Sequence, residues 1–405
     1  MNSAERAGLR PKGNVPTLRF PEFSGDWKES TIGKEFELYS GNTPSRLDKE
    51  NFVGDVNWIT SGELKEHYIG DTKEKISESS AKENNLRLMP EGTFVIAIYG
   101  LEAEGVRSTG SIITKRSTIS QACMAFTPKG DISNEFMYSW YKKHGNVIGI
   151  RYAQGTKQQN LSYDIIEKFK IRYPSLKEQD KLNSFISLLD TRIATQIRII
   201  NEIQSLISGI TQKISKHSSI RMTMLSELLE ERNEKNTALF PVHSVSVSEG
   251  VINQIDYLGR SFAAADTSHY NVAHKGDIIY TKSPTGEFPF GIVKRNAIES
   301  NVAVSPLYGV YKPISDDVAI YLHYYFCSPL NAQNYLHKLI QKGAKNTINI
   351  TNQRFVQNCI PLPDKKTLEG FVKLTTTVST KLKLEKSLLE KLQKQKRYLL
   401  TQMFV

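Results

Sequence analysis

Two long stretches of the chain place apolar residues at steps of three, four and seven positions, the pattern of one buried stripe on a helix. The first predicts a helix over residues 175–217, and no proline occurs between Pro174 and Pro241. The second predicts a helix from residue 365 to the C-terminus, with a basic run at 391–400 that fits a solvated outer face or a phosphate contact. A single amphipathic helix of this length cannot bury its apolar stripe alone, so each stripe must pack against another element.

The chain repeats itself at a distance of about 190 residues. The segment GTKQQNLSYDIIEKFKIRYP begins at Gly155, and GAKNTINITNQRFVQNCIPLP begins at Gly343. With one inserted residue the match continues at an offset of 189 residues into the predicted helices, where Ile200 falls on Leu389. A period this long indicates a duplicated domain rather than a solenoid of short repeats. Two matched helices from a tandem duplication are predicted to pair about a pseudo-twofold axis, and therefore antiparallel.

Two regions of about 150 residues lie before and between the predicted helices, and both mix short strand patterns with turn residues. EGTFVIAIYG (91–100) predicts a buried strand and EFMYSWYKKHG (135–145) an aromatic helix. HKGDIIYTKS (274–283) and IYLHYYFCSPL (320–330) echo them in the second region. The order of elements is shared while the side chains differ, so we expect one scaffold with two different surfaces.

The predicted fold class is α+β: two α/β domains separated by two long helices that form an antiparallel coiled coil, with a pseudo-twofold internal repeat. The predicted division is an N-terminal arm at 1–20, a first domain at 21–174, a first helix at 175–218, a second domain at 219–363 and a second helix at 364–405.

Composition narrows the class of protein. The apolar fraction of 39% and the charged fraction of 23% are those of a soluble globular protein. Cys123, Cys327 and Cys359 are isolated from one another, which favours reduced thiols in the cytoplasm over disulfides or a zinc site. The N-terminus has no apolar segment of a secretion signal. A net charge of +11 suits a polyanionic partner, usually nucleic acid.

A search for catalytic motifs predicts no catalytic residue, no metal site and no cofactor site in this chain. The sequence has no Walker A pattern, no GxGxxG turn and no HExxH, and it lacks the Asn/Asp-Pro-Pro-aromatic signature of adenine methylation. Asp55, Glu63 and Lys65 loosely resemble the carboxylate-plus-lysine cluster of metal-dependent nucleases. A stand-alone nuclease therefore stays open as an alternative, as does a coiled-coil scaffold that binds no DNA.

Polar and basic side chains on predicted loops are the candidates for DNA contact, because such groups bind base edges while lysines and arginines hold phosphates. An ordinary solvated loop, or a structural Gly-x-Lys turn, is the competing interpretation of each. The candidates are Thr60, Ser61, Arg107, Ser108, Lys115, Arg116, Lys157, Gln158, Lys282, Ser283, Thr285, Lys294, Arg295, Lys345 and Asn346.

The organisation of the chain resembles the specificity subunit of Type I restriction–modification systems. The resemblance rests on the twofold repeat, the Gly-Thr/Ala-Lys turn after each variable region, the long helix that follows each turn, and the opening PTLRFPEFSGDW (16–27). It covers essentially the whole chain. It implies a non-catalytic, DNA-binding subunit with two target-recognition domains, each of which reads one half of a bipartite DNA site.

The resemblance also implies partners. Two modification subunits would carry adenine N6-methylation with S-adenosylmethionine, and two restriction subunits would carry the ATP- and Mg-dependent translocase and nuclease; no membrane is involved. The helices would dock the modification subunits and set the gap between the half-sites. The second helix lacks a counterpart of Lys177-Glu178-Gln179, so its docking surface is expected to differ. Candidate partner-binding residues on the helix stripes are Ile193, Ile200, Ile207, Leu382, Leu389 and Leu399.

Overall fold

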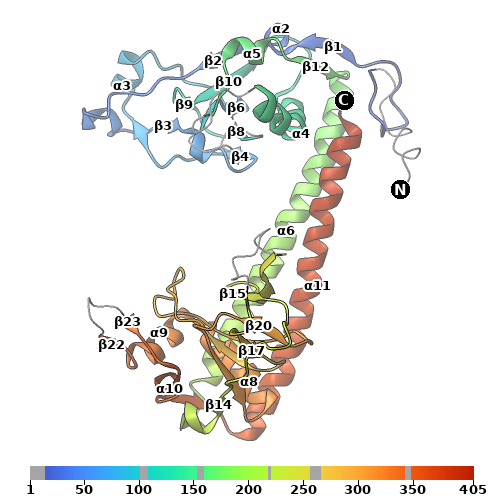
Figure 1. The fold of residues 1–405 in the computed structure, drawn as a ribbon. Coiled ribbons are helices and arrows are strands. Elements are labelled where there is room, and N and C mark those ends of the chain that lie inside the picture. Colours follow the sequence, from blue (N-terminus) through green and yellow to red (C-terminus); the bar gives the residue numbers. More distant parts are fainter. Residues whose placement is uncertain (1–13, 101–107, 153–158, 218–219, 256–265, 343–347) are drawn as a thin grey trace. The chain divides into compact units, whose positions relative to one another are not determined.

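The structure is a computed structural model that describes residues 14–100, 108–152, 159–217, 220–255, 266–342 and 348–405 (Figure 1). The chain divides into two compact units. Unit 1 comprises Met1–Thr195 together with Leu389–Val405, and unit 2 comprises Gln196–Leu388. Each unit therefore holds one globular region and one end of each long helix. The predicted α+β fold with two long helices is confirmed.

The two long helices have equal length. They are α6, Leu176–Ile214, and α11, Lys365–Met403, with 39 residues each. In unit 1, Leu182 of α6 and Met403 of α11 share one apolar core. Further along, Asp190 of α6 forms an ion pair with Lys396 of α11. The residue numbers rise along α6 as they fall along α11, so the two helices are antiparallel in this unit.

Unit 2 pairs the other halves of the same helices, again antiparallel. Ile214 packs with Phe371, and Gln196 donates a hydrogen bond from Nε2 to the backbone oxygen of Glu385 at 3.1 Å. Gln196 and Glu385 are sequence equivalents at the offset of 189 residues. A residue meets its own equivalent only at the centre of two matched antiparallel helices. Both side chains of this pair are buried within unit 2.

The globular region of unit 1 contains these elements in chain order: β1 Lys28–Thr31, α2 Ile32–Glu35, β2 Phe36–Ser40, η1 Lys49–Phe52, β3 Val56–Ile59, η2 Ser61–Glu63, β4 Tyr68–Ile69, β5 Lys75–Ile76, α3 Glu78–Glu83, β6 Phe94–Ala97, β7 Tyr99–Gly100, β8 Gly110–Ile113, β9 Ser117–Ile119, β10 Cys123–Pro128, α4 Asn134–Tyr152, β11 Gln159–Asn160, α5 Tyr163–Glu167 and β12 Lys170–Tyr173.

The main sheet of unit 1 has five strands in the order β2-β10-β6-β8-β4. The aromatic helix α4 packs against β6 and β8 of this sheet. Phe94 and Phe126 from the sheet and Phe136 from α4 are buried in the same core, which also includes Leu182 of α6. Unit 1 also has a second sheet, with three strands in the order β5-β3-β9.

The globular region of unit 2 contains these elements: β13 Arg221–Met224, η3 Leu225–Glu227, β14 Leu229–Glu231, β15 His243–Ser246, β16 Gly250–Asn253, β17 Asn271–Ala273, β18 Ile278–Tyr280, β19 Val293–Arg295, β20 Val302–Val304, β21 Gly309–Pro313, α8 Asp316–Phe326, α9 Pro329–His337, β22 Gln341–Lys342, β23 Ile348–Asn349, α10 Asn352–Phe355 and β24 Cys359–Leu362.

The main sheet of unit 2 repeats the topology of unit 1. Its four strands lie in the order β14-β21-β18-β19, which matches β2-β10-β6-β8 strand for strand in chain order. Each unit also has a two-stranded antiparallel ribbon, β1 with β12 and β13 with β24, that leads directly into the long helix. The duplication read from the sequence is therefore a duplication of topology as well.

Candidate nucleic-acid interface

The loop candidates of unit 1 have different surroundings. Thr60 begins η2, where its backbone N–H and its hydroxyl bind Glu63 Oε2 at 2.9 and 2.8 Å, and Ser61 is half-buried in the same turn. Ser108 has a φ of 54°, and its backbone oxygen accepts a 2.8 Å hydrogen bond from Lys142 Nζ. Burial lowers the pKa of Lys142 to about 8. These residues are fixed by contacts inside the unit.

The strand-end cations of unit 1 are more open. Lys115 lies 3.1 Å from a carboxylate oxygen of Asp71 and is still mostly exposed, and Arg116 is exposed. Five other candidates, Arg107, Lys157, Gln158, Lys345 and Asn346, lie outside the described residues.

Three candidates of unit 2 lie on one turn. Lys282 is half-buried, which lowers its pKa, while Ser283 and Thr285 are exposed. Thr285 exchanges two backbone hydrogen bonds with Phe288, at 3.0 and 2.9 Å, so the turn is closed by its own backbone. An exposed turn with a fixed backbone is suited to present side chains to a ligand.

Lys294 and Arg295 are not loop residues, contrary to the sequence-based expectation. They lie on β19, and the side chain of Lys294 is only 4% exposed, with Nζ 3.3 Å from Sγ of Cys327. Burial alone would raise the pKa of the Cys327 thiol, but His323 and Lys294 outweigh it and lower that pKa to about 6. Arg295 Nε donates to Asp316 at 3.1 Å. The Lys294 ammonium is therefore occupied inside unit 2 rather than available at its surface.

The stripe candidates are covered by the structure itself. Ile200 and Ile207 are 7% and 8% exposed, and the other four are half-buried: Ile193, Leu382, Leu389 and Leu399. Other large apolar side chains of the two helices are exposed, at Leu176, Leu188, Ile197, Leu206, Leu374, Leu384, Leu388 and Tyr398.

The nuclease-like cluster is used for local structure. Glu63 Oε2 accepts from Thr60, and its Oε1 accepts from the backbone N–H of Lys73 at 2.7 Å. Among the described residues, no group of three His, Cys, Asp or Glu side chains is arranged to hold a metal ion. In that same part of the chain, no helix has the length and apolar character needed to cross a membrane.

We call the contacts between the globular region of unit 1 and its helices the first joint, made by Arg19, Trp27, His67, Glu178, Gln179, Asp190 and Lys396. Its first half is buried at the start of α6. Glu178 accepts from Arg19 Nε and Nη2 at 2.8 and 2.7 Å, and from Trp27 Nε1 at 3.3 Å. Gln179 is fully buried; it accepts from Ser133 N–H at 2.8 Å and donates to two backbone oxygens.

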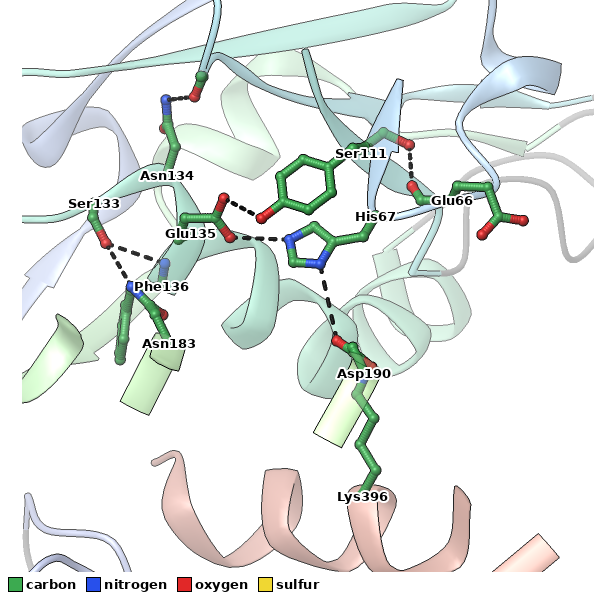
Figure 2. A network of polar contacts seen from close by, with 12 residues as sticks. Glu66, His67, Ser111, Ser133, Asn134, Glu135, Phe136, Asn183, Asp190 and Lys396 are labelled. Atoms are coloured by element: carbon green, nitrogen blue, oxygen red, sulfur yellow. Dashed lines mark hydrogen bonds and ion pairs between the residues drawn. The ribbon is translucent and has the colours of Figure 1, made fainter. Parts of the chain in front are cut away.

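The second half of the first joint is a line of polar groups around His67 (Figure 2). Its Nε2 lies 2.9 Å from Glu135 Oε2, and its Nδ1 faces Asp190 Oδ2 at 3.9 Å. The other carboxylate oxygen of Asp190 accepts from Lys396 Nζ of α11. The first joint is therefore a set of polar contacts, and it lies beside the apolar core that Leu182 of α6 and Met403 of α11 share with the same globular region.

We call the corresponding contacts in unit 2 the second joint, made by Tyr321, Tyr324, Leu368, Phe371 and Ser379. Phe371 of α11 meets the rings of Tyr321 and Tyr324 edge to face, with centroids 5.6 and 6.1 Å apart. Leu368 is buried in the same core. The one polar contact among these five residues joins the hydroxyls of Tyr324 and Ser379. These contacts of the second joint are therefore mostly apolar, and the same globular region also meets α11 through the exposed ion pair of Glu249 with Lys386 at 3.3 Å.

Residues 24–205 match the family model described as the Type I restriction modification DNA specificity domain. The match covers less than half of the chain, so residues 24–205 are similar to a Type I specificity domain. The MjaIX specificity subunit of Methanocaldococcus jannaschii is 28% identical over 172 residues, 42% of this chain and 39% of the relative. The EcoR124I/EcoR124II specificity subunit of Escherichia coli is 25% identical over 177 residues, 43% of each. The chain thus spans less than half the length of these curated relatives.

Solved structures extend the likeness in fold to nearly the whole chain. The S subunit of a Type I restriction–modification system from M. genitalium has a TM-score of 0.57 at 14% identity, and covers 96% of this chain and 99% of its own. A second structure, from work on the assembly and conformational transition of the type I R-M system, has a TM-score of 0.55 at 12% identity and covers 92% and 96%.

The contacts of the globular region of unit 1 with α6 were not predicted as a site. The sequence singled out Lys177-Glu178-Gln179 only because the second helix lacks it. Glu178 and Gln179 are buried and hold the globular region on its own helix, whereas Lys177 is exposed. The absence of a counterpart in the second half was the signal that the two joints differ.

Proposed function

We propose that this chain is the non-catalytic DNA-recognition subunit of a Type I restriction–modification assembly. Each globular region reads one half of a bipartite, asymmetric DNA site. The observation that carries the proposal is the specificity-domain match at residues 24–205, together with a second region that repeats the same strand order. The net charge of +11 supports a polyanionic ligand.

A duplicated reader has a physical advantage. One good pair of contacts to a base edge discriminates by only about 1–3 kcal/mol, so a single small module distinguishes few sequences. Two modules on one rigid spacer add their contacts without a second loss of translational freedom. Both can meet the same face of the duplex when the half-sites lie about one helical turn, ~34–36 Å, apart. The two continuous helices α6 and α11 are the proposed spacer.

The proposed partners are two modification subunits, which use S-adenosylmethionine, and two restriction subunits, which use ATP and Mg. The helices remain the proposed docking site for the modification subunits, on different residues from those first expected. The stripe is covered within each unit, whereas Leu188 is 70% exposed on α6 in unit 1 and Leu384 is 63% exposed on α11 in unit 2. Large exposed apolar side chains on a helix face are typical of an interaction surface.

A methylation map tests the proposed function. Genomic DNA from cells with and without this protein is sequenced for N6-methyladenine. We expect a split motif with a fixed gap to lose its methylation when the gene is deleted. An unchanged map contradicts the proposal. The salt dependence of DNA binding gives a second test. A protein that contacts phosphates should bind DNA with an affinity that falls as the salt concentration rises, whereas a scaffold should show no such binding.

A further inference from the structure

His67 is held in one orientation by its neighbours in unit 1. Its ring stacks on Tyr68 at 4.1 Å between centroids and on Tyr138 of α4 at 3.9 Å, with interplanar angles of 5° and 0°. Nε2 lies 2.9 Å from Glu135 Oε2, and Glu135 also accepts from the Tyr68 hydroxyl at 3.0 Å. A carboxylate only accepts, so Nε2 is the donor. The two stacks and this bond leave the ring little freedom to turn.

The fixed ring directs its other nitrogen toward the helices (Figure 2). Asp190 of α6 lies between His67 Nδ1 and Lys396 Nζ of α11, with one carboxylate oxygen toward each. The side chains of His67, Asp190 and Lys396 are 18%, 29% and 21% exposed, so water screens them only in part. The globular region, the first helix and the second helix are thereby linked by one line of polar groups.

This line has no counterpart in unit 2. At the offset of 189 residues, Asp190 corresponds to Ser379 and Lys396 to Ile207. Ser379 contacts the hydroxyl of Tyr324. Hydrogen bonds and close charge pairs depend on direction as well as distance, whereas apolar contact does not. Unit 2 has an ion pair between Lys386 of α11 and Glu249 at 3.3 Å, but its side chains are 36% and 46% exposed, more than those of His67, Asp190 and Lys396. The first joint therefore fixes orientation through contacts that water screens less.

A small change in orientation matters for a bipartite site. A domain of this size has a radius of gyration of roughly 15 Å, so its surface lies about 20 Å from a joint at its edge. A tilt of about 10° then moves that surface by about 3.4 Å, which is one base-pair step. The tilt of a recognition domain on its helices is thus equivalent to a change of one base pair in the gap.

We propose that His67, Asp190 and Lys396 are positioning residues that set the tilt of the first recognition domain, and thereby select the gap between the half-sites. The proposal rests on the proposed function and adds a specificity determinant that touches no base. It assigns discrimination between gap lengths to the first joint, while the bases of each half-site are read elsewhere.

The test uses the complete assembly with its modification subunits and a set of DNA duplexes. The duplexes carry both half-sites with the natural gap, or with a gap shorter or longer by one base pair. Asp190→Asn keeps the size of the side chain and removes its charge. We expect the ratio of methylation rates, natural gap over altered gap, to fall by about fivefold or more. The bases recognised in each half-site stay the same.

Matched variants separate positioning from damage. Asp180→Asn makes the same change at an exposed position of the same helix in unit 1, and should leave the ratio unchanged. Asp190→Glu keeps the charge and should retain most of the discrimination. Lys396→Gln breaks the line at its other end, and should lower the ratio even if Asp190→Asn does not fold.

The outcomes are distinct for the two proposals. Equal loss of methylation at all three gaps in Asp190→Asn and Lys396→Gln means that the line only stabilises unit 1, and overturns this inference. An unchanged ratio in both variants overturns it as well. If the wild-type assembly methylates no split site at all, the proposed function fails first.

Discussion

The two joints attach the same scaffold to matched helices by different chemistry. At equivalent positions, Gln179 of the first joint is a fully buried amide, and Leu368 of the second is part of an apolar core. Apolar burial stabilises without regard to direction, whereas a buried polar network stabilises only in one geometry and is costly when it is incomplete. The duplicated fold therefore tolerates either solution, and the proposed role of the first joint in setting an orientation follows from its larger share of buried polar contacts.

The largest expected effect comes from breaking the buried ion pair of the first joint. Glu178→Ala leaves Arg19 without its carboxylate, in a site where the two side chains are 2% and 16% exposed. Removing one partner of such a pair costs about 3–5 kcal/mol in the free energy of unfolding. The three tryptophans, Trp27, Trp58 and Trp140, all lie in unit 1, so tryptophan fluorescence during urea unfolding reports on this unit alone.

The control for this prediction lies at the same helix position of the second joint. Thr367 donates from its hydroxyl to Asp364 Oδ2 at 2.9 Å in an exposed turn. Thr367→Ala should cost about 1 kcal/mol or less, and should leave the tryptophan transition where it is. If the two substitutions have equal effects on that transition, the first joint does not depend on its ion pair.

Acid should weaken unit 1 through His144 of α4. Burial, with a smaller effect of Lys143, lowers the pKa of His144 from 6.5 to about 4, against a hydrogen bond to the Val405 oxygen that raises it. The folded state stays neutral while the unfolded state takes up a proton below pH 6.5, so stability is lost as the pH falls from 6.5 to 4. The loss is on the order of 3 kcal/mol.

Comparison of His144→Asn with the wild type isolates this contribution from that of the carboxylates, which titrate in the same range. The difference between the two tryptophan-detected free energies should shrink as the pH falls from 6.5 to 4. A difference that is constant with pH means that His144 does not remain neutral in the folded state.

Exchanging the buried residues of the two joints tests whether the first joint needs a polar side chain and the second an apolar one. Gln179→Leu leaves the Ser133 N–H and the oxygens of Asp131 and Pro174 without their partner. Leu368→Gln buries an amide in the apolar core of unit 2. Each should cost about 1–3 kcal/mol. Tryptophan fluorescence measures the loss of stability in Gln179→Leu, and circular dichroism at 222 nm measures it in Leu368→Gln. If either substitution stabilises the protein, the two joints do not differ in the way described.

The sequence predicted the repeated architecture because that information is local. Proline-free heptad stripes located α6 and α11 to within a few residues, and short apolar runs between glycines located β6 and β18. The joints could not be predicted, because His67, Asp190 and Lys396 are far apart in sequence and meet only in the folded unit. Lys294 was misplaced for a related reason: basic residues after a turn suggested a loop, but the backbone continues as β19.

The smallest expected effect is at the neutral contact of the second joint. Tyr324→Phe removes the hydroxyl that contacts Ser379 and keeps the ring against Phe371 of α11. One neutral hydrogen bond contributes about 0.5–1.5 kcal/mol, and Ser379 keeps a hydroxyl that can turn toward water in the adjoining cavity of about 410 Å³. Unit 2 should lose about 1 kcal/mol by circular dichroism, and discrimination between gap lengths should not change. A loss above about 3 kcal/mol, or a loss of discrimination equal to that of Asp190→Asn, would show that the second joint also fixes an orientation through this contact. Such a result would contradict the claim that only the first joint fixes an orientation, although the two units would still share one fold.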